Sequence, residues 1–416
     1  MPTPPRAGTL ARSLLPSLAC LALLAMSPAA CRRDPGGPGR TDPITAAPPE
    51  FQELYTALDQ RLVADLQLAT RRWDGRPTPV VFGAELITAN GNRGTALLEP
   101  TALLGVRTML DALQRAGVRG VTVSVSYPLL RPDFPNSARY AEFYRQVAVE
   151  VKSRGLVLFA KSGPVFPQPE FSPLPVSYAG LTLSRFSQEW RQHVHSVVAL
   201  MQPDYVTLFN EPSTMSDVVG LRFSVADVRQ VVTTALDGLE RGRTRVVAGA
   251  GTWDDPAYFR MLAELPGLDA LDAHVYPVNR DWFVPRLLEL GELARANGKG
   301  FLVGEAWLNK VGERELGGGV ASTPAIFARD VFDFWAPLDQ RFLDALVRTA
   351  YVTRMEFASL FWTRYLYAYL PYDERTRALP PLQRFQEADR AFLANLLSGT
   401  LSPTGARYRE LIAQTP

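Results

Sequence analysis

Two glutamates in this chain of 416 residues stand where an apolar run gives way to a loop. Glu211 follows the run at 205–210, and Glu305 closes the run at 300–305. A carboxylate beside a buried segment is costly unless it is hydrogen bonded or used in chemistry. Together, the pair could divide nucleophilic attack and proton transfer between them. Each also has a structural interpretation, since residues 210–213 could form a turn and Glu305 could belong to an ion pair.

The elements that carry these glutamates alternate along the chain. After one leading helix, eight strand-like runs alternate with eight amphipathic helical patterns, which indicates βα units and a parallel sheet. The predicted strands are 79–86, 120–127, 155–161, 205–210, 244–251, 268–274, 300–305 and 358–363. The count of eight, without an internal linker, favours a closed (β/α)8 TIM barrel over an open doubly wound sheet. We therefore expect a single catalytic domain at residues 50–416.

A barrel of this kind assembles its active site where strands end and βα loops begin. The fourth and seventh predicted strands would place Glu211 and Glu305 on opposite sides of the barrel mouth. Two carboxyl groups about 5 to 5.5 Å apart can cleave a glycosidic bond with retention of configuration. The strand positions therefore predict glycoside hydrolysis.

These strand ends resemble those of the clan A glycoside hydrolases, which are retaining (β/α)8 enzymes. That superfamily has an Asn-Glu pair at the end of strand 4 and a Glu nucleophile at the end of strand 7. The resemblance implies that Glu211 is the general acid/base and Glu305 the nucleophile. It also implies that Asn210 hydrogen bonds the 2-hydroxyl of the sugar. It does not identify a family within the clan.

Two more strand ends extend the resemblance. His274 and Tyr276 at the end of strand 6 are similar to the His-x-Tyr of several families in the clan, where the tyrosine hydroxyl supports the nucleophile. Trp362 on strand 8 matches an aromatic platform placed under the sugar. An ordinary histidine at a sheet edge remains the structural alternative for His274.

Other residues at strand ends are candidates for substrate contacts. Trp253 and Trp307 follow the fifth and seventh strands, and tryptophan faces stack on the apolar faces of sugar rings. Glu85 ends the first strand and could bind a sugar hydroxyl or form a structural ion pair. Lys161, one of four lysines, ends the third strand and could contact substrate. Ordinary loop packing is the alternative for each tryptophan.

One departure from the clan pattern concerns the second strand. Many families place an arginine at its end beside the nucleophile, but here the strand ends at Ser126 and Tyr127, and Arg131 comes several residues later. Either Ser126 or Tyr127 could supply a hydrogen bond in place of the arginine.

The N-terminus reads as an export signal over residues 1–30, with arginines ahead of an apolar stretch. Ala29, Ala30 and Cys31 resemble the end of a bacterial lipoprotein signal, in which the cysteine is lipidated. Residues 31–49 are rich in proline and glycine and would form a tether. We expect a lipid anchor in the bacterial cell envelope, at the periplasmic or outer surface. Simple secretion, with Cys31 left as a free thiol, is the alternative.

Composition narrows the class of partner. The 44 basic and 42 acidic residues nearly balance, which argues against a nucleic-acid binder. Three histidines, with His193 and His195 inside one helical pattern, argue against a metal-dependent hydrolase. We predict an oligo- or polysaccharide substrate and no cofactor or metal. The predicted function is that of an endo-acting β-glycanase that cleaves a hexose polymer such as mannan, glucan or galactan. The alternative is a barrel lipoprotein that binds glycans without cleaving them.

Overall fold

The computed structural model describes residues 47–169, 171–276, 283–312, 315 and 324–416. The predicted export signal, Cys31 and most of the predicted tether lie outside these residues. Among the helices that are described, none is long and apolar enough to cross a membrane.

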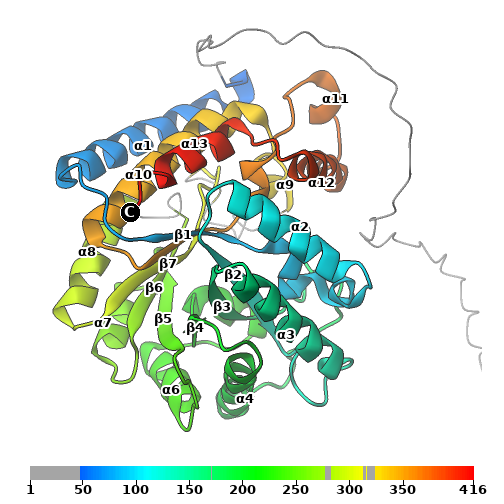
Figure 1. The fold of residues 1–416 in the computed structure, drawn as a ribbon, viewed down its shortest axis with the longest axis vertical. Helices are drawn as coiled ribbons and strands as arrows, with labels where there is room; N and C mark the ends of the chain where they lie inside the picture. The colour runs from blue at the N-terminus through cyan, green and yellow to red at the C-terminus, as the bar shows by residue number, and fades with distance from the viewer. Residues whose placement is uncertain (1–46, 170, 277–282, 313–314, 316–323) are drawn as a thin grey trace, which may run out of the picture. The chain divides into compact units, whose positions relative to one another are not determined.

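Eight parallel strands close into a barrel in sequence order, with β1 paired to both β2 and β8 (Figure 1). The strands are β1 Val81–Glu85, β2 Gly120–Tyr127, β3 Val157–Pro164, β4 Tyr205–Thr207, β5 Arg245–Gly251, β6 Ala270–Val275, β7 Gly300–Ala306 and β8 Phe357–Leu360. The predicted (β/α)8 barrel is confirmed. Strand β4 ends before residue 210 because the chain leaves the sheet to enter a left-handed turn at Glu211.

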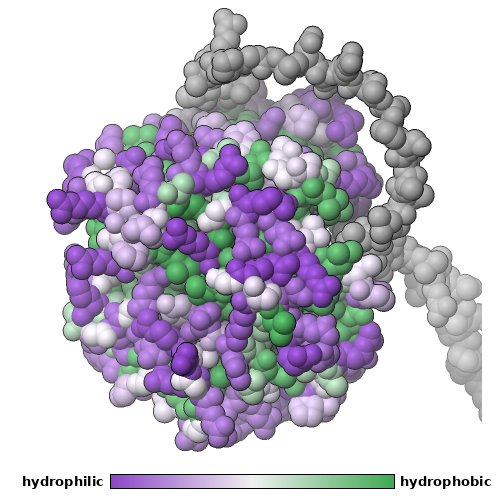
Figure 2. All heavy atoms as spheres, viewed as in Figure 1, coloured by the Kyte–Doolittle hydropathy of each residue, from purple (hydrophilic) through white to green (hydrophobic). Residues whose placement is uncertain are grey.

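Helices surround the barrel (Figure 1). They are α1 Gln52–Arg72, α2 Ala102–Arg115, α3 Ser137–Ser153, α4 Leu183–Met201, α5 Pro212–Val219, α6 Val225–Leu236, α7 Pro256–Glu264, α8 Phe283–Ala296, α9 Pro324–Phe327, α10 Ala336–Thr353, α11 Glu374–Arg377, α12 Pro381–Ser398 and α13 Pro403–Ile412. Short 3₁₀ helices span Pro49–Phe51, Ile87–Ala89, Gly91–Leu98, Asp333–Trp335 and Thr363–Leu366. The leading helix α1 and the last helix α13 both pack against α10. On the face in Figure 2, polar residues predominate and hydrophobic ones form scattered patches.

The interior of the barrel is layered. An apolar layer consists of Phe159, Val247, Ala270, Leu302 and Phe357. Because side chains alternate between the two faces of a strand, the next inward-facing side chains lie two residues after those of the apolar layer. Several of them are polar. This polar layer includes Glu85, Thr122, Lys161, Thr207, Asp272 and Ser359, all buried. The layer connects by hydrogen bonds such as Thr122 to Glu85 and Thr207 to Asp272.

A β-bulge interrupts the pairing of β6 with β7 below the barrel mouth. Ala273 pairs with Val303, but His274 pairs with Glu305, so Gly304 is an extra residue in β7. The Gly304 N–H donates to Asp272 Oδ1 at 2.7 Å. Val303 packs outward in the main core, and side chains in a strand alternate between its faces. The bulge therefore brings Glu305 onto the inward face that it shares with His274.

Candidate active site

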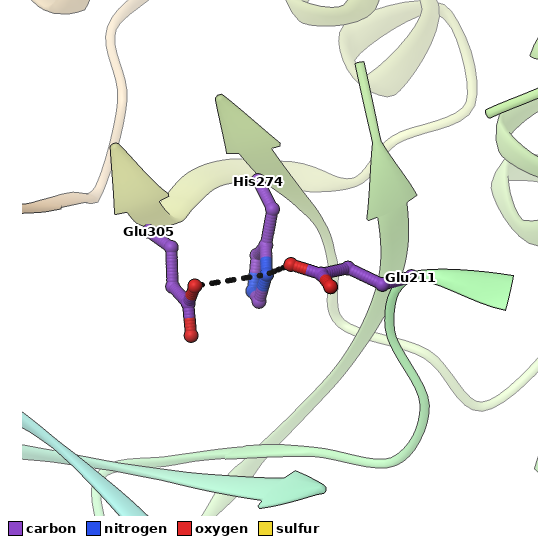
Figure 3. A group of neighbouring side chains, drawn as sticks. All are labelled: Glu211, His274 and Glu305. Atoms are coloured by element: carbon purple, nitrogen blue, oxygen red, sulfur yellow. Dashed lines mark hydrogen bonds and ion pairs between the residues drawn. The ribbon is translucent and has the colours of Figure 1, made fainter. Parts of the chain in front are cut away.

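Glu211, His274 and Glu305 point toward one another at the carboxyl ends of the strands (Figure 3). His274 lies between the glutamates, with Nδ1 at 2.6 Å from Glu211 Oε1 and 3.6 Å from Glu305 Oε2. One oxygen of each glutamate and a ring nitrogen of His274 all lie within 4.8 Å of one another. Retaining glycosidases need carboxyl groups about 5 to 5.5 Å apart, whereas inverting ones need about 6.5 to 9.5 Å. The geometry fits the retaining arrangement.

Each carboxylate oxygen of Glu305 accepts a hydrogen bond from a different strand. Lys161 Nζ on β3 lies 2.5 Å from Oε1, and the Tyr276 hydroxyl, which follows β6, donates to Oε2 at 2.9 Å. Burial opposes ionisation of Glu305, but the charges of Lys161 and His274 lower its pKa below the ordinary value. Glu305 is therefore held as an oriented anion, which suits a nucleophile.

The surroundings of Glu211 differ from those of Glu305. Its close polar neighbour is His274, which is 1% exposed. Burial disfavours the charged imidazole, but Glu305, Asp272 and Glu211 raise the pKa of His274 well above its ordinary value. Asp272 Oδ2 lies 3.5 Å from the other ring nitrogen. Glu211 is thus held by a single imidazole, whereas Glu305 is held by an ammonium group and a hydroxyl.

The backbone of Glu211 is held in an unusual conformation. Its φ of 43° is left-handed, a conformation that costs a non-glycine residue roughly 1 to 2 kcal/mol. The following residues anchor it, because the N–H and Oγ of Ser213 donate to Asp254 Oδ1 at 3.1 and 2.5 Å. Burial raises the pKa of Asp254 to about 6. Trp253 Nε1 donates to the same Ser213 Oγ at 3.1 Å. Asp254 is a supporting residue that sequence reasoning missed.

The other predicted substrate contacts divide into two groups. Asn210 is 8% exposed and makes no hydrogen bond through its side chain within the described part of the chain, so its amide is available to a ligand. Trp253 and Trp362 are partly exposed, with Trp253 packed 5.6 Å from the ring of Tyr276. Trp362 packs against Phe361 at 5.1 Å. These residues belong to the strand ends around the carboxylate pair.

Two residues predicted to contact substrate, Trp307 and Glu85, are too deeply buried to do so. Trp307 is 0% exposed and stacks on Tyr365 at 5.3 Å, so it packs within the core and does not face a sugar. Glu85 is also 0% exposed, and its oxygens accept from Asn90, Thr122 and Ser124. It forms the structural ion pair that was its alternative, with Lys161 Nζ at 2.9 Å.

Lys161 on β3 makes the contact with Glu305 that Ser126 or Tyr127 on β2 could have supplied. The Tyr127 hydroxyl donates to Glu189 and not to Glu305, and Ser126 is buried in β2. Lys161 is 2% exposed and is positioned between Glu85 and Glu305, so it does not reach out to substrate. In the sequence, Lys161 stands out only as one of few lysines and as the last residue of a predicted strand. The sequence did not indicate which carboxylates it would contact.

Glu211, His274 and Glu305 are also close enough to bind a cation. However, Lys161 and Tyr276 already donate to both oxygens of Glu305, and a second cation beside the ammonium group would be repelled. The other histidines lie on α4, as predicted, and do not act as a pair. His193 Nε2 lies 3.2 Å from the Val125 carbonyl, and His195 Nε2 lies 3.1 Å from the Ala235 carbonyl.

Comparisons with known proteins concern the fold. No protein family profile and no curated protein matches this chain. Among solved structures, GH5_18 from Bifidobacterium longum subsp. longum ATCC 55813 is similar, with 16% identity, a TM-score of 0.53, and coverage of 80% of this chain and 79% of that chain. A variant of it in complex with Manb1-4GlcNAc has 14% identity and a TM-score of 0.50, covering 80% and 78%. The exo-beta-1,4-mannosidase Op5Man5 from Opitutaceae bacterium strain TAV5 has 16% identity and a TM-score of 0.51, covering 81% and 60%. This chain therefore shares the barrel fold of glycoside hydrolases.

Proposed function

We propose that this chain is a retaining β-glycosidase with Glu305 as nucleophile and Glu211 as general acid/base. The observation that carries the proposal is the carboxylate pair, with one oxygen of each residue within 4.8 Å and with unlike partners on the two sides. Lys161 and Tyr276 contact Glu305, whereas His274 contacts Glu211. Two carboxyl groups in unlike surroundings can hold different protonation states, as a general acid and a nucleophile must.

The first step forms a covalent glycosyl ester. A carboxylate oxygen of Glu305 bonds to the anomeric carbon, the bond from that carbon to the leaving oxygen breaks, and the Glu211 carboxyl gives its proton to the leaving oxygen. Asn210, whose amide is free of partners in the described chain, hydrogen bonds the 2-hydroxyl. Tyr276 and Lys161 hold the attacking carboxylate in one orientation, which lowers the entropic cost of reaching the transition state.

The second step reverses the roles. Glu211 accepts a proton from water, the water oxygen bonds to the anomeric carbon, and the ester bond to Glu305 breaks. Two inversions at the same carbon give net retention. His274, at 2.6 Å from Glu211 Oε1, holds this carboxyl group in place through both steps.

The proposed substrate is a β-linked hexose glycan such as mannan, glucan or galactan, cut internally. Trp253 and Trp362, partly exposed at the ends of β5 and β8, would stack on successive sugar rings. β-Mannosides come first on the test panel, because the similar structures include an exo-beta-1,4-mannosidase and a complex with Manb1-4GlcNAc. The proposed location is the bacterial cell envelope, through a lipid on Cys31.

The test measures hydrolysis of β-glycans and of dinitrophenyl β-glycosides by wild type, Glu211→Gln and Glu305→Gln. We expect Glu305→Gln to lose both activities. Glu211→Gln should lose about 10²- to 10⁴-fold on polymers but much less on dinitrophenyl glycosides, whose leaving group needs no proton. Glu356→Gln is the matched control, because Glu356 accepts from Tyr205 and Arg245 at the opposite end of the barrel and should be needed for stability only.

Proton NMR of the first product decides the stereochemistry. Release of the β-anomer supports retention, and release of the α-anomer contradicts it. Equal activity of wild type and both active-site variants would refute the residue assignment. A wild-type protein that binds β-glycans but cleaves none would favour the alternative, a glycan-binding barrel without catalysis.

A further inference from the structure

The buried ion pair between Lys161 and Glu85 lies directly beneath the proposed nucleophile. Lys161 Nζ is 2.9 Å from Glu85 Oε2 and 2.5 Å from Glu305 Oε1, and its charge also lies 5.1 Å from the centre of the Phe361 ring. Both Lys161 and Glu85 are essentially inaccessible, at 2% and 0% exposed. Neither can touch substrate, so any effect on the reaction passes through Glu305.

Glu85 is fixed in place by the polar layer. Asn90 and Ser124 donate to its Oε1 at 3.1 and 2.9 Å, while Thr122 donates to Oε2 at 2.9 Å. Three donors and an ammonium group satisfy a buried carboxylate well, as a charge in this position requires. Burial disfavours the charged lysine, but Glu305 and Glu85 together raise the pKa of Lys161 above its ordinary value. The lysine therefore remains a cation.

The charge balance explains why a second carboxylate is useful. With Lys161 paired to Glu305 alone, the nucleophile would be fully neutralised, and ester formation would leave a buried cation without a partner. An unpaired buried charge is strongly unfavourable. With Glu85 present, the three groups carry one net negative charge before attack. After Glu305 becomes an ester, Lys161 and Glu85 remain a neutral pair.

We propose that Lys161, held by Glu85, is the positioning residue that orients Glu305 and keeps it ionised. This inference rests on the proposed glycosidase function. The groups facing Glu305 are Lys161 from β3, Tyr276 and His274 from β6 and the residues after it, and Glu211 after β4. Glu85 on β1 acts on Glu305 only through the lysine.

Two substitutions should move the pH profile in opposite directions. Lys161→Met removes the positive charge, so the acid limb of kcat/KM should shift upward by about one pH unit or more. In Glu85→Gln the charge of Lys161 acts on Glu305 alone, so the acid limb of kcat/KM should shift downward. The value of kcat should also fall, because the nucleophile is neutralised and because Lys161 has no anionic partner once the ester has formed. A merely structural role would not give opposite shifts.

Lys310→Met is the matched control. Lys310 is the other fully buried lysine paired with a buried acid, with Nζ at 2.6 Å from Asp339 Oδ1. Its loss should lower the melting temperature about as much as loss of Lys161 but leave the acid limb in place. If Lys161→Met does not fold, the downward shift in Glu85→Gln decides the question.

The outcomes separate this inference from the proposed function. Wild type that hydrolyses β-glycosides with retention, together with unshifted acid limbs in Lys161→Met and Glu85→Gln, overturns the role of the pair and leaves the glycosidase proposal standing. Wild type that hydrolyses no β-glycoside overturns both. Equal upward shifts in Lys161→Met and Lys310→Met would also overturn the inference, because the effect would then be a general loss of structure.

Discussion

Replacing Tyr276 by phenylalanine removes one of the two hydrogen bonds that hold Glu305. The hydroxyl donates to Oε2 at 2.9 Å, and burial raises the pKa of Tyr276 well above its ordinary value, so the donor keeps its proton. A hydrogen bond to a charged group contributes about 1.5 to 3 kcal/mol. One pKa unit corresponds to about 1.36 kcal/mol. Removal of the hydroxyl should therefore raise the pKa of Glu305 by roughly one to two units.

The sign of this effect fixes the assay. The pKa of Glu305 lies below its ordinary value in the wild type, and the anion is the form that attacks in the proposed mechanism. The acid limb of kcat/KM for a dinitrophenyl β-glycoside should shift upward by about one to two pH units in Tyr276→Phe. Activity at the alkaline side should change less, because Lys161 still contacts and orients the carboxylate. The loss of activity in Tyr276→Phe should therefore be largest at acidic pH.

Tyr408→Phe is the control for loss of a buried hydroxyl. Tyr408 donates to the Gly83 carbonyl at 2.9 Å, the same distance as in the active site, but its acceptor is neutral. This control should lose about 0.5 to 1.5 kcal/mol of stability and keep the wild-type pH profile. The reasoning is refuted if the acid limb of Tyr276→Phe coincides with that of wild type, or if both variants shift equally.

Three further predictions concern stability, location and metal dependence. Burial raises the pKa of Asp65 to about 7 from an ordinary value of 3.8, so the free energy of unfolding of the wild type should fall as pH rises between these values. Asp65→Asn should remove up to about 4 kcal/mol of this fall. Denaturant titrations that show the same pH dependence in both proteins would contradict this prediction. Cys31→Ser should move the full chain from the detergent phase to the aqueous phase after expression in a bacterial host, and unchanged partition would count against lipidation. Chelation with EDTA should leave hydrolysis unchanged, because Lys161 and Tyr276 already occupy both oxygens of Glu305, whereas loss restored by a divalent cation would contradict this.

The sequence predicted the fold and the central pair because both depend on local patterns. Buried parallel strands read as apolar runs, and a glutamate that terminates such a run is visible without knowledge of contacts. The capping box at Ser224 and Asp227, which begins α6, was predictable for the same reason. Parallel closure then places the ends of β4 and β7 at one rim, so Glu211 and Glu305 could be expected to meet.

The roles of Glu85, Lys161 and Trp307 could not be predicted, because they depend on contacts between distant strands. Glu85 and Lys161 satisfy each other across the barrel interior, from β1 and β3. Trp307 lies just beyond the bulge of β7, where simple alternation no longer tells which face a side chain takes, and it packs in the core. Strand-end position alone does not distinguish a side chain in the mouth from one just below it.

The bulge at Gly304 makes the register of β7, and not only its composition, a condition for the proposed catalysis. Without the bulge, Gly304 would pair with His274, and Glu305 would turn toward the helix layer. Neighbouring side chains can adjust gradually to a substitution, whereas register cannot, because a strand side chain lies on one face of the sheet or on the other. During divergence, homologues that keep the proposed activity should therefore conserve this bulge while residue types around it vary.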